Sequence, residues 1–257
     1  MGIYEHPRYY EVAFGFFDVK QQIDAFEQII KKFSRVEVKR VLDVACGPSL
    51  QLRELARRGY EAVGLDLSSE MLEYLSVRAR EEGLKVETVR ADMFGFQLSR
   101  KVDFAFVMMG SLAVDSDDRF LKHLDSVASS LNSGGLYFVQ NFLFNWEASA
   151  GGQSWEMERD DVKVGTTFKV RWKELQDRVY TEDMVVDVDD HGKRFRLESR
   201  EDLQFIPLPE FKRLVALNGK FEFLGCWKGS ESTWFLDKPL DSAESMSNLN
   251  MVLLRRK

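Results

Sequence analysis

Between residues 41 and 142, short apolar segments alternate with longer segments whose apolar residues recur at helical spacing. The short segments lie at 41–45, 61–66, 85–92, 102–109 and 136–142, and all but 85–92 are mainly apolar. The longer segments include 68–83 and 117–135, and the second of these places on one face Phe120, Leu121, Leu124, Val127, Ala128 and Leu131. Buried parallel strands are apolar throughout, whereas helices that cover them show a period near 3.6. This alternation predicts a parallel sheet with helices on both faces.

The same alternation returns near the C-terminus. Residues 208–219 read as a helix, with Pro209 near its start and Gly219 at its end. Residues 220–227 and 250–257 read as two further strands. The chain is therefore predicted to be an α/β protein with a Rossmann-like, doubly wound, mostly parallel sheet of seven strands.

Between the two α/β portions, the period of the apolar residues shifts towards two. Segments 166–172, 177–188 and 193–205 alternate in this way, and Asp189 to Gly192 form a turn sequence between the last two. Alternation of this kind indicates antiparallel strands, with a hairpin at the turn. We predict a β-rich antiparallel insertion after the fifth strand.

These patterns divide the chain into three parts. Residues 1–40 contain an aromatic segment and a helix, residues 41–145 and 206–257 form the α/β domain, and residues 146–205 form the insertion. The chain of 257 residues is long enough to bury a sizeable core.

Charge and cysteine content narrow the function classes. The net charge of −6 argues against a broad nucleic-acid-binding surface. The two cysteines, Cys46 and Cys226, have neither metal-site spacing nor a disulfide framework. No apolar run is long enough to cross a bilayer, and the N-terminus has no signal-peptide pattern. We expect a cytoplasmic protein that binds neither nucleic acid nor membrane.

Candidate chemistry lies just after each predicted strand, where open α/β sheets bind ligands. The first strand is followed by a turn of small residues, Ala45, Cys46 and Gly47. Such a turn at a helix N-terminus lets backbone N–H groups approach a ligand. Asp66, about twenty residues on, can accept hydrogen bonds from ribose hydroxyls, and Asp92 can accept one from an exocyclic amine. Together these positions outline a nucleoside site.

At this point the sequence resembles the class I S-adenosylmethionine-dependent methyltransferases. "VLDVACGPS" resembles the first motif of the family, "VGLDLSSEMLEYL" the second and "RADMFGF" the third, and two C-terminal strands, the last antiparallel, also fit. The resemblance implies S-adenosylmethionine as cofactor and an N-terminal segment that folds over it. It implies cofactor contacts from Ala45, Cys46, Gly47, Asp66, Leu67, Met71, Asp92, Met93 and Met109.

The first motif departs from the family pattern. Ala45 and Ser49 stand where the family most often has glycine, so only Gly47 keeps its usual identity. A non-enzymatic protein that binds S-adenosylmethionine therefore stays open as an alternative. A nicotinamide-dependent oxidoreductase is a further alternative, disfavoured because the G-x-G-x-x-G pattern is missing.

Methyl transfer needs a positioned acceptor and, for an amine or hydroxyl, a base nearby. Candidate acceptor-side catalytic residues are Tyr10, His6, Ser111 and Asn141. We assign neither His123, within a predicted helix, nor His191, at a hairpin tip, to the site. "FVMMG" lacks the aspartate used by metal-dependent relatives, so the resemblance implies no metal.

The acceptor is expected to be a small molecule methylated on N or O. Many small-molecule methyltransferases carry an insertion after the fifth strand that covers the substrate, and the chain is loosely similar to the glycine and sugar-amine N-methyltransferases. Trp155 and Trp172, with Trp146 at the edge, are candidates for apolar walls. A homodimer contact through the insertion is an alternative or additional role.

Overall fold

The computed structural model describes residues 2–140, 152–229, 234–239 and 250–257. Its main sheet has eight strands in the order β11-β10-β12-β5-β4-β1-β2-β3. Their bounds are β1 (Arg40–Val44), β2 (Glu61–Asp66), β3 (Val86–Arg90), β4 (Val102–Val107), β5 (Leu131–Gln140), β10 (Phe221–Gly229), β11 (Trp234–Pro239) and β12 (Asn250–Arg256). The first five strands form the parallel pairs β1–β2, β2–β3, β1–β4 and β4–β5. β12 lies between β5 and β10 and is antiparallel to both. The predicted seven-stranded sheet is confirmed, and β11 adds an edge strand that we did not predict.

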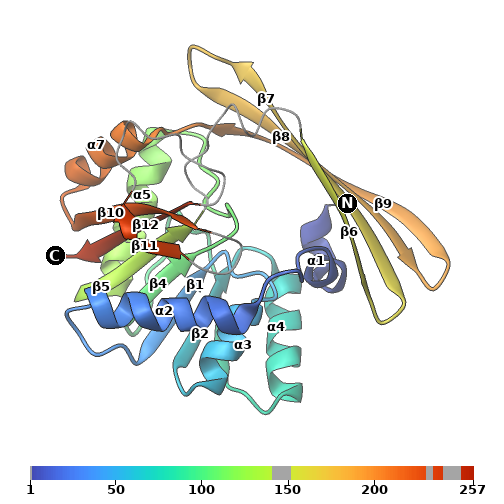
Figure 1. Ribbon diagram of the computed structural model, residues 1–257, viewed down its shortest axis with the longest axis horizontal. Helices are drawn as coiled ribbons and strands as arrows, with labels where there is room; N and C mark the ends of the chain where they lie inside the picture. The colour runs from blue at the N-terminus through green and yellow to red at the C-terminus, as the bar shows by residue number, and fades with distance from the viewer. Residues whose placement is uncertain (1, 141–151, 230–233, 240–249) are drawn as a thin grey trace.

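Helices cover both faces of this sheet (Figure 1). α5 (Asp117–Ser130) and α7 (Leu208–Asn218) pack on one face, where the core includes Phe120, Leu124 and Phe211. α2 (Val19–Phe33), α3 (Leu50–Arg57) and α4 (Ser69–Glu81) contribute to the core on the other face. Four of these helices have an N-cap side chain that accepts a hydrogen bond from a backbone N–H in the first turn. The N-caps of α2, α3, α4 and α5 are, in that order, Asp18, Ser49, Ser68 and Ser116.

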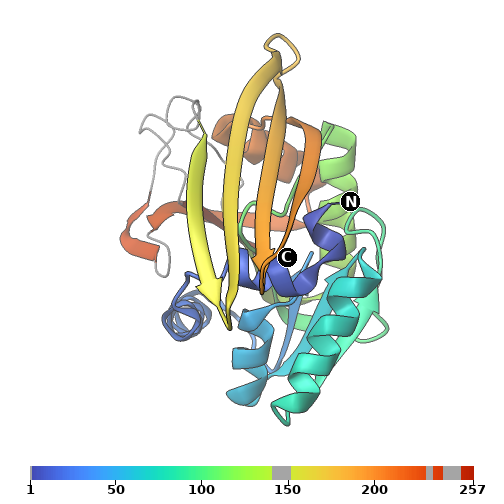
Figure 2. The same cartoon turned by 90° about the vertical axis from the view of Figure 1, so that its right-hand side faces the viewer.

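The predicted insertion is a separate antiparallel sheet of four strands, which confirms its place after β5. The strands, in spatial order, are β6 (Gln153–Arg159), β7 (Val162–Glu174), β8 (Val179–Asp190) and β9 (Lys193–Gln204), and they lie side by side in Figure 2. His191 and Gly192 have positive φ angles of 53° and 87°, as a tight hairpin requires. β6 was not predicted as a strand of its own.

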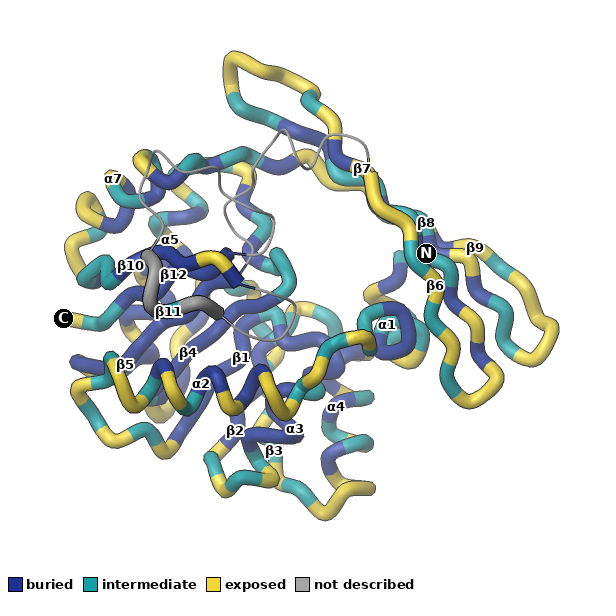
Figure 3. The backbone as a smooth tube through the Cα atoms, viewed as in Figure 1, coloured by how far each residue is buried: buried dark blue, intermediate teal, exposed yellow. Residues whose placement is uncertain are grey.

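The two faces of the insertion sheet differ in character, and buried positions alternate with more exposed ones along its strands (Figure 3). Val164, Met184 and Val186 lie on the inner face and pack against the N-terminal segment. The outer face carries cross-strand ion pairs, among them Asp187 with Arg196 at 2.7 Å and Asp189 with Arg194 at 2.8 Å.

The N-terminal segment lies between the two sheets. η1 (Ile3–Glu5) and α1 (Pro7–Ala13) place Ile3, Val12 and Ala13 in the apolar cluster of the insertion sheet. The indole N–H of Trp155 on β6 donates to the carbonyl of Ala13 at 2.8 Å. α1 is thereby fixed against the insertion at one end of the α/β domain (Figure 1).

In the described part of the chain, no helix is both long and apolar enough to span a membrane. Over the same residues, no group of three or more His, Cys, Asp or Glu side chains is arranged to hold a metal ion. Asn141 and Trp146, named in the sequence analysis, lie outside the described residues.

Candidate cofactor site

The turn after β1 is built from residues in unusual backbone conformations. Ala45, Gly47 and Ser49 have φ angles of 56°, 53° and 27°. Only Gly47 lacks a Cβ atom, so Ala45 and Ser49 hold strained conformations that glycine would adopt at little cost. Ser49 compensates because its hydroxyl caps α3, accepting a hydrogen bond from the N–H of Leu52 at 3.0 Å. The backbone path that glycine usually provides is thus reached here with alanine and serine.

Asp43 lies buried beneath this turn, 5% exposed. Its carboxylate accepts a hydrogen bond of 2.6 Å from the Ser49 hydroxyl. Burial raises the pKa of Asp43 to about 8, the Ser49 hydrogen bond opposes this rise, and the charge of Asp66 adds to it. A buried carboxylate with a raised pKa favours a cation nearby, because a cation stabilises the ionised form.

Asp66, at the end of β2, is oriented by two backbone N–H groups. Gly47 donates to one carboxylate oxygen at 2.8 Å, and Ser68 donates to the other at 2.9 Å. Ser68 also caps α4 by accepting from the N–H of Met71 at 3.1 Å. Each carboxylate oxygen retains a second lone pair, so Asp66 can still accept hydrogen bonds from a ligand.

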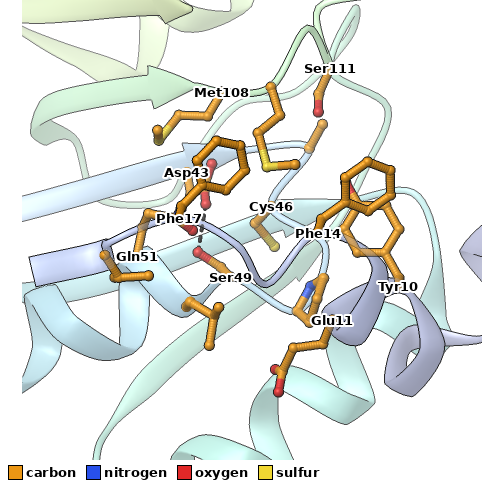
Figure 4. Close-up of a pocket in the computed structure, with 15 residues that line it drawn as sticks. Tyr10, Glu11, Phe14, Phe17, Asp43, Cys46, Ser49, Gln51, Met108 and Ser111 are labelled. Atoms are coloured by element: carbon orange, nitrogen blue, oxygen red, sulfur yellow. Dashed lines mark hydrogen bonds between the residues drawn. The ribbon is translucent and has the colours of Figure 1, made fainter. Parts of the chain in front are cut away.

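A cleft opens above the turn and the end of β4 (Figure 4). It is lined by Tyr10, Glu11, Phe14, Phe17, Val19, Asp43, Ala45, Cys46, Pro48, Ser49, Leu50, Gln51, Met108, Met109 and Ser111. The ring of Tyr10 lies over the turn, 3.8 Å from where a Cβ atom on Gly47 would be. Burial raises the pKa of Tyr10, with the charges of Asp66 and Asp43 adding to the effect, so its hydroxyl is neutral at physiological pH.

The end of β4 forms a second wall of the cleft. Met109 has a positive φ of 58°, and its N–H donates to the side-chain carbonyl of Gln140 at 3.2 Å. The side-chain nitrogen of Gln140 is buried and has no hydrogen-bond partner within the described residues. Ser111 follows in the same loop and is half-buried. These contacts hold Met109 and Ser111 beside the turn after β1.

Asp92 and Met93 follow β3. Asp92 is exposed, accepts from the N–H of Phe94 at 3.0 Å and lies 3.6 Å from the guanidinium of Arg119. Met93 packs partly against the core, and its carbonyl is 3.0 Å from a ring nitrogen of His123. The loop therefore presents a carboxylate to solvent while its backbone is tied to α5.

The structure brings together many of the predicted site residues. Tyr10, Ala45, Cys46, Met109 and Ser111 line the cleft. The side chain of Met71 is buried, with its sulfur 3.9 Å from the site of a Cβ atom on Gly47.

Other predicted residues lie apart from the cleft. Leu67 follows Asp66 but is 67% exposed. His6 packs near Tyr9 and near Phe195 of the insertion sheet, outside the cleft lining. Asn141 falls outside the described residues, so its role stays a prediction.

Sequence reasoning missed several residues of the lining. Glu11 lies in α1 and Phe14 is the C-cap of α1, so their place depends on how the N-terminal segment folds back. Asp43 could have been identified from the sequence. It is a carboxylate within an apolar strand, and burying a carboxylate costs free energy unless it is hydrogen-bonded or paired with a cation.

The inner face of the insertion sheet carries two glutamates. Glu182 and Glu201 are direct cross-strand neighbours on β8 and β9. Burial raises the pKa of Glu182 to about 7, and the charge of Glu201 adds to the rise. Tyr180, two residues before Glu182, belongs with Leu203 to a small apolar cluster that contacts Ala113 in the loop after β4. Glu182 therefore lies on the side of the sheet that faces the α/β domain.

Part of the α/β domain is similar in sequence to known methyltransferases. Residues 41–135 match the model of a methyltransferase domain. Over 52 residues the chain is 42% identical to the ubiquinone biosynthesis O-methyltransferase of Salmonella paratyphi A, and over 62 residues 36% identical to that of Yersinia pestis. These matches cover 20% and 24% of this chain and 22% and 26% of the relatives, so they span about a quarter of the relatives' length.

Solved structures share the fold over nearly the whole chain. An S-adenosylmethionine-dependent methyltransferase from Clostridium acetobutylicum superposes with a TM-score of 0.77 at 17% identity, covering 96% of both chains. The sugar N-methyltransferase KedS8 from Streptoalloteichus gives 0.71 at 18% identity, covering 93% of this chain and 88% of its own. CalS10, an amino pentose methyltransferase from Micromonospora echinaspora, gives 0.68 at 16% identity, covering 93% and 91%. At these identities the likeness establishes the fold.

Proposed function

Residues 41–135 form a class I S-adenosylmethionine-dependent methyltransferase domain, and we propose that the chain transfers the methyl group of S-adenosylmethionine to a nitrogen or oxygen of a small molecule. The observation that carries the proposal is the junction of Gly47, Asp66 and the α3 N-terminus at the carboxyl edge of the sheet. That edge is where α/β sheets bind nucleotides.

The residues present fit this cofactor. The two free lone pairs of Asp66 suit ribose hydroxyls, and the first backbone N–H groups of α3, unused within the helix, suit a carboxylate. Asp43, buried with a raised pKa, suits the cationic end of the cofactor. When bound, S-adenosylmethionine supplies a methyl group already activated by its sulfonium. We assign its binding to the predicted set from Ala45 to Met109, with Asp43 added.

The protein's own contribution is to position the acceptor and exclude water. Phe14, Phe17 and Met108 give the cleft apolar walls. Tyr10 and Ser111, both in the lining, can hold the acceptor by hydrogen bonds, since each hydroxyl donates and accepts. We assign residues 1–40 to capping the cofactor and the insertion to covering the acceptor.

Among N and O acceptors, an amine is supported best. KedS8 is a sugar N-methyltransferase and CalS10 acts on an amino pentose by their names, and both share this fold. Within the described residues, no Lys, Arg or His pairs with Glu182 or Glu201, whereas Asp183 on the opposite face pairs with Arg171 at 3.1 Å. Like charges directly opposite each other are unfavourable unless a cation compensates them, and an ammonium substrate would do so.

A homodimer through the outer face of the insertion has less support. That face carries the Asp187–Arg196 and Asp189–Arg194 pairs, and the centres of stable interfaces are depleted of such charges. A homodimer contact elsewhere on the insertion stays a prediction.

The first experiment is calorimetric titration of the purified protein with S-adenosylhomocysteine and, in parallel, NADH. Binding of the first alone supports the cofactor assignment, and binding of NADH alone would favour an oxidoreductase. Isotope-labelled S-adenosylmethionine is then offered with panels of amines and hydroxy compounds. Label transfer to amines supports the proposal, transfer only to hydroxyls contradicts the amine preference, and binding without transfer to either favours the non-enzymatic alternative.

A further inference from the structure

The segment between β3 and β4, residues 91–101, has no regular structure, yet it carries the predicted adenine-side residues Asp92 and Met93. Its backbone groups must find partners outside a sheet or helix. Ala91 donates its N–H to the carbonyl of Asp66 at 3.1 Å, which ties the start of the segment to the end of β2. Arg100, at its other end, pairs with Glu61 of β2, and α5 supplies the contacts between these ends.

Three buried polar side chains of α5 form hydrogen bonds with the backbone of this segment, at successive positions along it. His123 contacts the carbonyl of Met93 at 3.0 Å, Ser126 accepts from the N–H of Phe96 at 3.3 Å, and Ser130 accepts from the N–H of Leu98 at 3.1 Å. His123 and Ser130 are fully buried and Ser126 is 7% exposed. Positions 123, 126 and 130 are spaced by three and four, so they lie along one face of the helix.

Arg119, one turn before His123, extends the same row to the exposed end of the segment. Its guanidinium stacks over the ring of Phe94 at 3.9 Å and lies 3.6 Å from the carboxylate of Asp92. The row of Arg119, His123, Ser126 and Ser130, which we call the α5 polar row, therefore contacts Asp92, Met93, Phe94, Phe96 and Leu98.

The contacts of His123 determine its tautomer. The carbonyl of Met93 can only accept, so Nδ1 of His123 carries the proton and donates to it. Nε2 lies 2.5 Å from the hydroxyl of Tyr137 and accepts from it. Burial lowers the pKa of His123 to about 4, so the ring stays neutral at physiological pH and this arrangement persists.

We propose that His123 is a positioning residue for adenine recognition, which holds the Met93 backbone so that the Asp92 carboxylate faces the exocyclic amine of the adenine. The inference rests on the proposed function, because it assumes that this loop meets the adenine of S-adenosylmethionine. His123 touches no ligand itself. It acts through the carbonyl of Met93. The Tyr137 hydroxyl donates to Nε2 and so keeps the proton of the ring on Nδ1, which donates to that carbonyl.

The test compares His123→Asn with His123→Gln. Asparagine can place its side-chain N–H near the position of Nδ1 and keep the bond to Met93, but it does not reach Tyr137. Glutamine reaches toward Tyr137 and loses the bond to Met93. By calorimetry, we expect His123→Asn to bind S-adenosylhomocysteine within about threefold of wild type and His123→Gln to bind about tenfold more weakly.

A second readout separates positioning from stability. S-Inosylhomocysteine replaces the exocyclic amine of adenine by a carbonyl, and wild type should prefer the adenine ligand. His123→Gln should lose most of that preference. Ser130→Ala, which also removes a buried side-chain-to-backbone bond from the α5 polar row, should keep it, because its bond lies at Leu98.

The outcomes are distinct. If wild type does not bind S-adenosylhomocysteine, the proposed function and this inference fail together. If wild type binds but His123→Gln keeps both affinity and preference, only the inference fails. Equal losses in His123→Gln and Ser130→Ala would also overturn it, since both variants would then act through stability alone.

Discussion

The backbone N–H of Gly47 donates a 2.8 Å hydrogen bond to the carboxylate of Asp66, which ties the turn after β1 to the end of β2. The same carboxylate accepts from the N–H of Ser68 at 2.9 Å, so one side chain orients both loops at the nucleotide edge of the sheet. Asp66 therefore has a structural and a binding role, and the two can be separated by substitution.

Asp66→Ala should weaken binding of S-adenosylhomocysteine by about a hundredfold or more, because it removes charged hydrogen bonds worth roughly 1.5–3 kcal/mol each. Asp66→Asn keeps one acceptor oxygen and should lose less. Calorimetric titration of both variants measures the difference. Binding of the alanine variant as tight as that of wild type would remove Asp66 from the site.

The raised pKa of Asp43 predicts a pH-dependent affinity. With a pKa of about 8, the group is largely protonated below about pH 7 in the ligand-free protein, and a cationic ligand favours the ionised form. Binding of S-adenosylmethionine should therefore release a proton, and affinity should rise from pH 6 to pH 7.5 by at most about tenfold per unit. Titrations in buffers of different ionisation enthalpy detect the released proton.

The matched variant for this prediction is Asp43→Asn, which keeps the shape of the side chain and cannot titrate. Its affinity should be lower than that of wild type and nearly independent of pH over the same range. A pH dependence that persists unchanged in Asp43→Asn would assign the proton to another group.

The strained turn after β1 predicts that substitution of Ala45 by glycine does not lower the free energy of unfolding. Ala45 has a φ of 56°, which costs an L-residue roughly 1–2 kcal/mol, while glycine loses roughly 0.5–1 kcal/mol of chain entropy on folding. Ala45→Gly should thus leave the free energy of unfolding unchanged or raise it by up to about 1.5 kcal/mol. Ala56→Gly, within α3, should lower it by about 1 kcal/mol. Urea unfolding of both variants tests this, and equal losses would mean that the turn is unstrained.

Most strands of the α/β domain were predictable because they are largely apolar and carry their own signal. Val102 to Val107, for example, are buried except for Asp103, which is half-buried. β6 was missed although Trp155 and Met157 alternate with Glu156 and Glu158, since seven residues of such alternation next to a glycine-rich entry are a weak pattern. Local periodicity therefore identified the strands whose apolar pattern is long or strong and missed β6, whose pattern is short.

The predictable part of the candidate site was the set of residues that follow strand ends, together with Tyr10 of the aromatic N-terminal segment. Gly47, Asp66 and Met109 were found because parallel strands bring their carboxyl ends to one edge. Glu11 was not found, because its place depends on how α1 docks against the insertion. His123 lies on a helix with an apolar face, and its contact with Met93 joins residues 30 positions apart. Such pairings depend on tertiary packing, which a single sequence does not display.

Glu11 links three parts of the molecule and provides the last prediction. Its carboxylate, 3% exposed, pairs with Arg53 of α3 at 2.5 Å and with Arg159 of β6 at 2.8 Å. Arg53 is 4% exposed and keeps its pair with Glu82 at 2.5 Å, so Glu11→Ala removes one charged hydrogen bond of a buried cation, and we expect a loss of about 1.5–3 kcal/mol of stability. Glu210→Ala breaks the exposed pair with Arg213 and should cost at most about 1 kcal/mol.

Arg159→Leu provides the functional half of this prediction. It leaves the Arg53 pair in place but removes the ion pair between α1, which carries Tyr10 over the turn, and β6 of the insertion sheet. S-adenosylhomocysteine should then dissociate several-fold faster than from wild type, with a smaller loss of stability than in Glu11→Ala. Stopped-flow displacement measures the dissociation rate. An unchanged rate would mean that the Glu11–Arg159 pair has no part in holding α1 over the cofactor.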